Sequence, residues 1–185
     1  QLIQSTQRAD GGVPMVAGRD ALVRVFVVAS AANGVQPAVR LRLFQGAAPV
    51  DSLDVPAPAG AVPLTPDTAN LGGSWNVLIP AARVASGMSY QVEVDPSDVV
   101  AETDESDNRW PGAGATQAVS VQAVPDLTVR FVPVRQTVNN LTGRVNSTNA
   151  DAFADVSRRM FPLGQMNAQL RATFATDAPV YQSDD

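Results

Sequence analysis

The alternation of apolar and polar residues in the first two thirds of the chain predicts short β-strands. Residues 88–95 show it most clearly, because every second residue from Met88 to Val94 is apolar and the residues between are polar. This pattern is typical of a strand with one buried face and one face in water. A strand is also predicted over residues 20–29, whose run from Ala21 to Ala29 is apolar on both faces except at Arg24, as in a central strand covered on both sides. We expect Arg24 to point outward, with its stem along the sheet.

Shorter segments complete a predicted sandwich of two antiparallel sheets. Further strands are expected at residues 2–6, 13–17, 38–44, 74–79 and 116–124. Glycines predict a turn at residues 9–12, and the proline-rich residues 56–66 indicate a loop. Strands at this spacing, without helical periodicity, indicate two packed sheets. We expect their core to consist of Val23, Val25, Val27, Leu41, Leu43, Trp75, Val77, Ile79, Tyr90, Val92, Val94, Val119 and Val121.

Beyond Val124 the pattern changes and predicts a small α+β segment. Apolar residues alternate in residues 127–131 and again in residues 168–174, as in two strands. The predicted fold class is therefore mainly β, with an antiparallel β-sandwich over residues 1–124 and an α+β segment over residues 125–185.

One short helix is predicted between these last two strands. Thr148 or Asn149 can cap its start, and Pro162 ends it. The apolar stripe of this helix consists of Phe153, Val156 and Met160. Because the segment has few large apolar side chains, we expect it to pack on the sandwich or to be the opening part of a larger domain.

Charge and composition restrict the function. The net charge is −5, and residues 1–124 carry twelve acidic residues against seven arginines. Nucleic-acid binding needs clustered positive charge, so we expect no nucleic-acid partner. No stretch has the roughly twenty apolar residues that a membrane span requires. Arg40 and Arg42 share one strand face, which predicts a solvated face, with anion binding as the alternative.

The chain contains neither His nor Cys. A Ser-His-Asp or Cys-His nucleophile, a His-bearing zinc site, a Cys-ligated cluster and a disulfide are therefore impossible within it. We expect no enzymatic activity from this chain. Since it starts at Gln1 without an initiator Met, we expect an internal or processed segment of a longer protein.

A long acidic loop follows the strand at residues 88–95 and is the one dense cluster of candidate ligands. Ca²⁺ takes six to eight oxygen ligands, which the loop could supply. The alternative is a solvated turn whose side chains cap backbone amides. No other cofactor is expected. The candidate calcium ligands are Asp95, Asp98, Glu102, Asp104, Glu105 and Asp107.

The two tryptophans have two possible uses. Trp75 lies at a core-facing position of a predicted strand, and Trp110 precedes Pro111 at a turn. We expect them to pack in the core and at a hinge, with carbohydrate stacking as the alternative.

The acidic loop also carries a family resemblance. Residues 94–109, Val-Asp-Pro-Ser-Asp-Val-Val-Ala-Glu-Thr-Asp-Glu-Ser-Asp-Asn-Arg, are similar to the signature of the bacterial cell-adhesion-related immunoglobulin-like domain. In that domain a strand leads into a hairpin of Glu-x-x-Glu-x-Asn-Asn type. Glu102, Glu105 and Asn108 match it, and Asp107 stands where the family has its first Asn.

Two further stretches extend the resemblance. Residues 13–19, Val-Pro-Met-Val-Ala-Gly-Arg, followed by the strand at residues 20–29, resemble the start of such domains where they precede metal-dependent peptidase domains in large exported bacterial proteins. Residues 127–176 resemble the lead-in segment of an exported bacterial zinc metallopeptidase-type protein. The matching stretches there are residues 131–134, Phe-Val-Pro-Val, and 160–163, Met-Phe-Pro-Leu.

The resemblance implies an immunoglobulin-like β-sandwich in a non-catalytic structural or interaction module. Its partner would be a neighbouring metallopeptidase domain of the same polypeptide, with the zinc ligands outside this chain. The resemblance also implies an extracellular or cell-surface location. The alternative hypothesis is a calcium-dependent adhesion module that binds polysaccharide or protein through the acidic loop.

Overall fold

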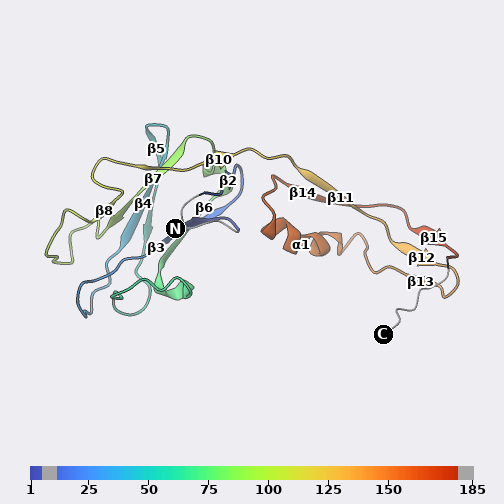
Figure 1. Ribbon diagram of the computed structural model, residues 1–185, viewed down its shortest axis with the longest axis horizontal. Coiled ribbons are helices and arrows are strands. Elements are labelled where there is room, and N and C mark those ends of the chain that lie inside the picture. Colours follow the sequence, from blue (N-terminus) through green and yellow to red (C-terminus); the bar gives the residue numbers. More distant parts are fainter. Residues whose placement is uncertain (6–11, 179–185) are drawn as a thin grey trace. The chain divides into compact units, whose positions relative to one another are not determined.

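The computed structural model describes residues 1–5 and 12–178. These residues are mainly β, as predicted, with one α-helix and two short 3₁₀ helices, η1 (Leu71–Gly73) and η2 (Ala81–Arg83) (Figure 1). The chain divides into two compact units, residues 1–123 and 124–185. Most of the predicted turn at residues 9–12 lies outside the described residues. No helix in the described ranges is long and apolar enough to cross a membrane.

The first sheet of residues 1–123 has three antiparallel strands, with β3 (Ala21–Val25) in the middle. Its strands are β1 (Leu2–Ile3), β3 and β6 (Trp75–Ile79), in that order. The central position of β3 was predicted from its two apolar faces. The sequence predicted that this strand continues to Ala29, but β3 ends at Val25. It ends there because residues 26–29 have no partner strand among the described residues.

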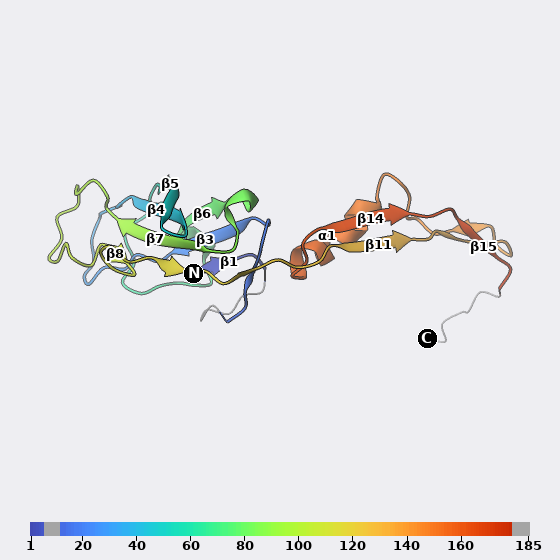
Figure 2. The same ribbon diagram turned by 90° about the horizontal axis from the view of Figure 1, so that it is seen from above.

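The second sheet is also antiparallel and has β7 at its centre (Figure 2). Along the sheet run β5 (Ala48–Val55), β4 (Val39–Gln45), β7 (Met88–Val94) and β8 (Arg109–Trp110), and β9 (Gln117–Ala118) also pairs with β7. The sequence predicted β4 and β7 but not β5. A tight turn at Gly46, with φ of 59°, joins β4 to β5.

The predicted closing strand at residues 116–124 is wrong as a single element. It consists of β9 and of β10 (Val121–Gln122), which pairs in parallel with β2 (Met15–Val16). The two short strands bond to different partners, β7 and β2. The chain changes partner between them, so no continuous ladder can form.

All thirteen predicted core residues lie in the core of this unit or pack against it. Val23, Trp75 and Ile79 come from the first sheet, and Leu41 and Val92 come from the second. Both sheets therefore bury their apolar faces in one shared core. Trp75 is buried as predicted, and its indole N–H donates to the Pro37 carbonyl at 2.9 Å.

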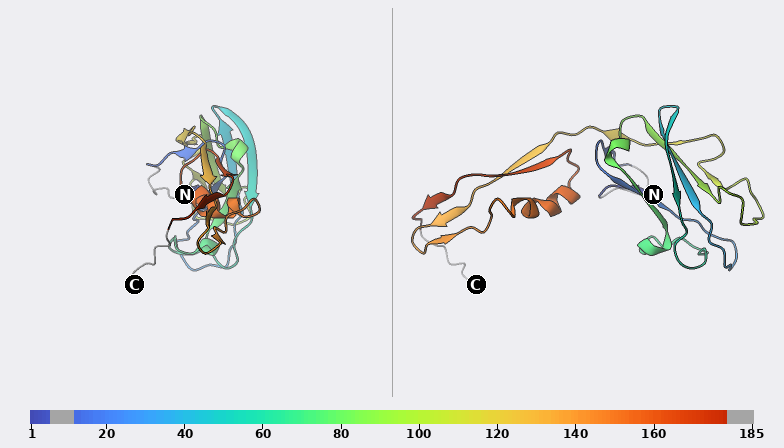
Figure 3. Two further views of the ribbon diagram at one scale, coloured as in Figure 1. Left: turned by 90° about the vertical axis from the view of Figure 1, so that its right-hand side faces the viewer. Right: turned by 180° about the vertical axis from the view of Figure 1, so that it is seen from behind.

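Residues 124–185 form a second unit with a β-α-β arrangement. The strands β11 (Leu127–Phe131) and β14 (Met166–Leu170) pair in parallel, and the helix α1 (Ala150–Met160) lies beside β14 (Figures 2 and 3). A second small sheet contains β12 (Val134–Gln136), β13 (Leu141–Thr142) and β15 (Phe174–Thr176). The predicted strand at residues 168–174 is thus two strands with different partners, β11 and β12.

The helix buries its small side chains instead of its large ones. Ala150 and Ala154 are buried, whereas the predicted stripe of Phe153, Val156 and Met160 is exposed. Asn149 occupies the N-cap position, but its side chain makes no capping bond and instead accepts a hydrogen bond from the backbone N–H of Asn146. Phe153 still touches its own unit, since its ring centre lies 6.1 Å from that of Phe131 on β11.

Candidate functional site

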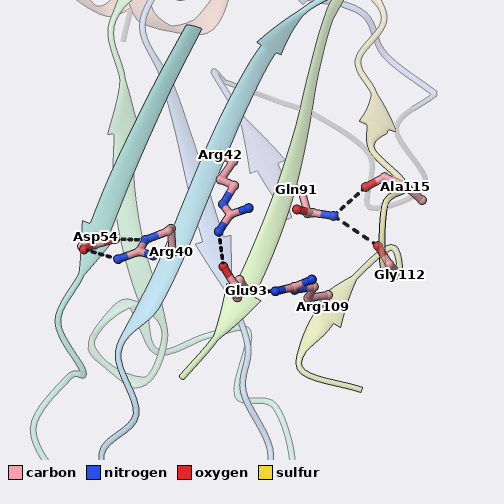
Figure 4. Close-up of polar contacts among 8 residues, drawn as sticks. All are labelled: Arg40, Arg42, Asp54, Gln91, Glu93, Arg109, Gly112 and Ala115. Atoms are coloured by element: carbon pink, nitrogen blue, oxygen red, sulfur yellow. Dashed lines mark hydrogen bonds and ion pairs between the residues drawn. The ribbon is translucent and has the colours of Figure 1, made fainter. Parts of the chain in front are cut away.

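The polar face of β7 is buried, which corrects the expectation of a half-buried strand. Ser89, Gln91, Glu93 and the adjoining Asp95 are all at most 7 % exposed. The Gln91 side-chain amide donates to the carbonyls of Gly112 and Ala115, at 3.2 and 2.9 Å (Figure 4). Polar side chains and the turn at residues 111–115 therefore cover the face that the sequence assigned to water.

Glu93 lies between two arginines from the neighbouring strands (Figure 4). One carboxylate oxygen accepts from Arg42 Nη2 at 2.7 Å, and the other accepts from Arg109 Nε at 2.9 Å and Nη2 at 2.6 Å. The carboxylate is buried, but both arginines reach water. Both oxygens of the buried carboxylate therefore accept short, charge-assisted hydrogen bonds. These bonds link β7 to its neighbours β4 and β8.

Both arginines on the predicted solvent-facing side of β4 pair with carboxylates of neighbouring strands. Arg40 forms a bidentate pair with Asp54 on β5, at 2.6 and 2.9 Å. Hydrogen bonding to Arg40 lowers the pKa of Asp54, and the same bond raises the pKa of Arg40. Arg42 is paired with Glu93. Both guanidinium groups therefore serve cross-strand pairing.

Arg24 does not point into water as the sequence predicted. It is 7 % exposed, and its guanidinium donates to Ser74 Oγ and to the carbonyls of Thr68 and Asn70. These bonds hold the loop before β6 against β3. The carbon at the centre of the guanidinium also lies 5.0 Å from the centre of the Phe26 ring, close enough for a cation–π contact.

The acidic loop begins with a buried carboxylate. Asp95 is 5 % exposed and has a left-handed backbone, with φ of 43°. Its Oδ2 accepts from the backbone N–H groups of Val99 and Val100, at 2.8 and 2.7 Å. Its Oδ1 is buried and has no hydrogen-bond partner in the described part of the chain.

Two more loop carboxylates also accept hydrogen bonds within the loop. Asp104 Oδ1 accepts from the N–H and the hydroxyl of Ser106, at 2.9 and 2.6 Å, and these bonds lower the pKa of Asp104. Glu105 accepts from the N–H of Glu102 at 3.2 Å and from the Asn108 side chain at 2.9 Å. Hydrogen bonds of this kind are expected for a solvated turn whose side chains cap backbone amides, the alternative to a calcium site.

The loop carboxylates do not converge on one point. Within residues 1–5 and 12–178, no three acidic side chains come close enough to hold a metal ion. Burial, followed by the charges of Glu105, Asp107, Asp95 and Asp98, raises the pKa of Glu102. Residues 95–108 contain no arginine or lysine that could compensate the negative charge of the loop. Calcium binding by Asp95, Asp98, Glu102, Asp104, Glu105 and Asp107 stays a prediction.

A cleft of about 1020 Å³ lies next to this loop, entirely within residues 1–123. Its lining includes residues 23–33 and, from the second sheet, Tyr90, Val92 and Trp110. Glu102, Asp104 and Asp107 also line the cleft. Sequence periodicity could not predict the cleft, because it does not show which segments lie opposite one another. The available signal was the apolar run at residues 25–29, which continues past the end of β3.

Trp110 corrects a second expectation. It is 48 % exposed in the cleft, and its ring centre lies 5.5 Å from that of Tyr90. The indole therefore does not pack in a closed hinge. The cleft combines apolar walls, one accessible indole and an acidic rim, a combination suited to binding an extended ligand.

Comparison of the chain with models of known protein families, with curated proteins and with solved structures gives no match. The resemblance to the cell-adhesion-related immunoglobulin-like domain and to a metallopeptidase lead-in therefore stays a prediction.

Proposed function

We propose that this chain is a non-catalytic structural and interaction module of a large exported bacterial protein, located outside the cell or on its surface. One observation carries the proposal: Glu93, the buried acid of the central strand, is fully used in pairing with Arg42 and Arg109. A catalytic acid or base needs a free position for substrate. Here the charge holds three strands together.

The fold of residues 1–123 supports an immunoglobulin-like β-sandwich. Two antiparallel sheets share one core, and the buried Trp75 fixes the start of β6 through its bond to Pro37. Two sheets packed on one core make a rigid body that can hold neighbouring domains apart or in register.

The exposed apolar residues of the second unit support a neighbouring domain as its partner. Phe153, Phe161 and Phe174 are each more than half exposed. Apolar surface of this kind marks interaction sites. In the proposal this partner is the metallopeptidase domain of the same polypeptide, whose position the module fixes.

Activity measurements test the proposal directly. The purified chain should hydrolyse neither casein nor a panel of glycosides. In the parent protein, deletion of residues 1–124 should lower peptidase activity while the zinc content stays unchanged. Hydrolysis by the chain alone at a rate that the Glu93→Gln or Glu102→Gln substitution abolishes would contradict a non-catalytic role. A parent protein with full activity after the deletion would contradict the positioning role.

Calcium-dependent adhesion is the second candidate. The unpartnered Oδ1 of Asp95 and the raised pKa of Glu102 favour it, since both would gain from a nearby cation. Calcium at one hundred times its Kd should stabilise the fold by ~2.7 kcal/mol. An unchanged melting temperature between EDTA and calcium at the ten-millimolar scale would remove this candidate.

A further inference from the structure

Asp95 lies at a strained point of the backbone, directly before Pro96. Its φ of 43° is left-handed, although a residue that precedes proline normally adopts extended backbone. A positive φ in a residue other than glycine persists only where the surroundings hold it, and such residues cluster at sites of chemistry. The fold therefore holds the peptide bond between Asp95 and Pro96 next to a backbone conformation that is unfavourable by itself.

Hydrogen bonds engage two of the three oxygens of Asp95. Its backbone carbonyl oxygen accepts from the N–H of Asp98 at 3.0 Å. Its side-chain Oδ2 accepts from the N–H groups of Val99 and Val100, at 2.8 and 2.7 Å. The third oxygen, Oδ1, is buried and has no hydrogen-bond partner among the residues that the structure describes. Three N–H donors thus fix the carbonyl and the carboxyl group, and they leave one carboxyl oxygen unengaged.

The same donors suit an attack of Oδ1 on the backbone carbonyl carbon of its own residue. This attack closes a cyclic anhydride. The N–H of Asp98 would stabilise the negative charge that develops on the carbonyl oxygen. The N–H groups of Val99 and Val100 would stay on Oδ2 while it becomes a carbonyl oxygen of the anhydride. The tertiary amide nitrogen of Pro96 accepts a proton more readily than an ordinary peptide nitrogen, so it is the better leaving group.

We propose that the chain cleaves itself at the peptide bond between Asp95 and Pro96. Oδ1 of the protonated carboxyl group adds to the Asp95 carbonyl carbon, the bond from this carbon to the Pro96 nitrogen breaks, and the carboxyl proton passes to that nitrogen. Water then opens the anhydride, which leaves two carboxyl groups on Asp95 and a free amine on Pro96. The reaction consumes only water, and each chain reacts once. The inference therefore goes beyond the proposed role without giving the chain catalytic turnover.

The two pieces would stay associated after cleavage. β8 follows the cleaved bond and pairs with β7 before it, with Glu93 and Arg109 in register and joined by their ion pair. β9 also pairs with β7, and β10 pairs with β2. Cleavage would therefore replace the covalent connection between residues 1–95 and 96–185 by a non-covalent one that a denaturant separates.

Mass spectrometry of the purified full chain, kept in mildly acidic buffer, tests the proposal. Two products with the masses of residues 1–95 and 96–185 should accumulate, and they should separate in size exclusion only in urea. The rate constant should not change when the chain is diluted, as expected for an intramolecular reaction. Added hydroxylamine should trap the anhydride as a hydroxamate at Asp95.

The chain held unfolded in concentrated urea at the same pH measures the ordinary lability of an Asp-Pro bond. The folded chain should react at least about tenfold faster, since a single oxyanion donor supplies roughly 10²–10³-fold in enzymes. This comparison separates a reaction that the fold promotes from one that any chain with this dipeptide undergoes.

Substitutions identify the groups that act. Asp95→Asn removes the attacking carboxyl group, and Pro96→Ala keeps it but gives a poorer leaving group, so each should slow cleavage at least about tenfold. Asp98→Asn is the matched control, because it changes an exposed carboxylate of the same loop and keeps the backbone N–H. It should cleave like wild type. Thermal melts check that each variant is folded.

Several results would overturn the proposal. These are no cleavage of the folded chain, equal rates in the folded and unfolded chain, and equal slowing by Asp98→Asn and Pro96→Ala. A wild-type rate in Asp95→Asn or in Pro96→Ala would assign the cleavage to a contaminating protease. None of these measurements uses casein, glycosides or the activity of the parent protein, so they leave the test of the proposed function separate.

Discussion

The two units of this chain cover their apolar side chains to very different extents. In residues 1–123 the large core residues Trp75, Leu41, Leu43 and Ile79 are almost completely buried. They come from two sheets that face each other across one core. Each sheet supplies the apolar cover that the inner face of the other sheet needs.

Residues 124–185 leave most of their large apolar side chains uncovered. The parallel pair β11 and β14 is covered by one helix, of which only Ala150 and Ala154 are buried. Large exposed residues of this unit are Leu127, Val134, Leu141, Phe153, Val156, Met160, Phe161, Leu170 and Phe174. Two small sheets and a single helix offer too little surface to bury these residues.

Separate expression of the units should give the largest effect. Residues 1–124 should fold alone, whereas residues 125–185 should not, because their few buried side chains cannot offset ~1.5 kcal/mol of ordering entropy per residue. Amide spectra and thermal melts of the two pieces measure the difference. A dispersed spectrum and a cooperative melt for residues 125–185 would remove the contrast between the units.

The core of the first unit should not tolerate a charge. Val92→Asp should destabilise the unit by at least about 4 kcal/mol, because an unpaired carboxylate would be buried between the sheets. Denaturant unfolding followed by tryptophan fluorescence measures this loss. Val99→Asp, at a position 76 % exposed, is the matched control and should unfold like wild type. A Val92→Asp protein with wild-type stability would show that Val92 does not face the core.

The polar face of β7 should contribute less than its apolar face. Glu93→Ala should cost about 1–3 kcal/mol, since Arg42 and Arg109 lose their buried partner but can still reach water. Removal of the exposed partner of Arg40, by Asp54→Ala, should leave the urea midpoint unchanged. Equal losses in the two variants would mean that burial of Glu93 adds nothing to its pairing.

The acidic loop should give the smallest effect and a distinctive pH dependence. The raised pKa of Glu102 means that its ionised form disfavours the fold. The protonated form of Glu102 favours the fold. This contribution to stability is fully present below the unfolded pKa of about 4.3 and is lost as pH rises through the folded pKa. Glu102→Gln should therefore raise the free energy of unfolding at pH 7, by no more than about 0.5 kcal/mol, and the gain should vanish below about pH 4.

The neighbouring Asp104 supplies a control of opposite sign. Its pKa is lowered by the hydrogen bonds from Ser106, so its stabilising contribution is present above the unfolded pKa and is lost as pH falls through the folded pKa. Asp104→Asn should lower the melting temperature at pH 7. If both variants shifted it in the same direction, the loop would not have the charge distribution described above.

Much of the first unit could be predicted from the sequence. Alternation predicted β4, β6 and β7, and it placed Leu41, Trp75 and Val92 on core faces. The order of strand, helix and strand in residues 127–170 was also visible. These features depend on residues a few positions apart, whose shared face follows from the geometry of one strand or helix.

Tertiary structure alone decided what lies opposite each face. Period two shows that Gln91 and Glu93 share a side of β7, but their burial depends on partners that are distant in the sequence. Glu93 meets Arg109 from 16 residues away and Arg42 from 51 residues away. Such partners are chosen by how the sheets pack. The sequence therefore determined the strands and the core of this protein, whereas packing determined the buried ion pairs of Glu93 and the cleft beside the acidic loop.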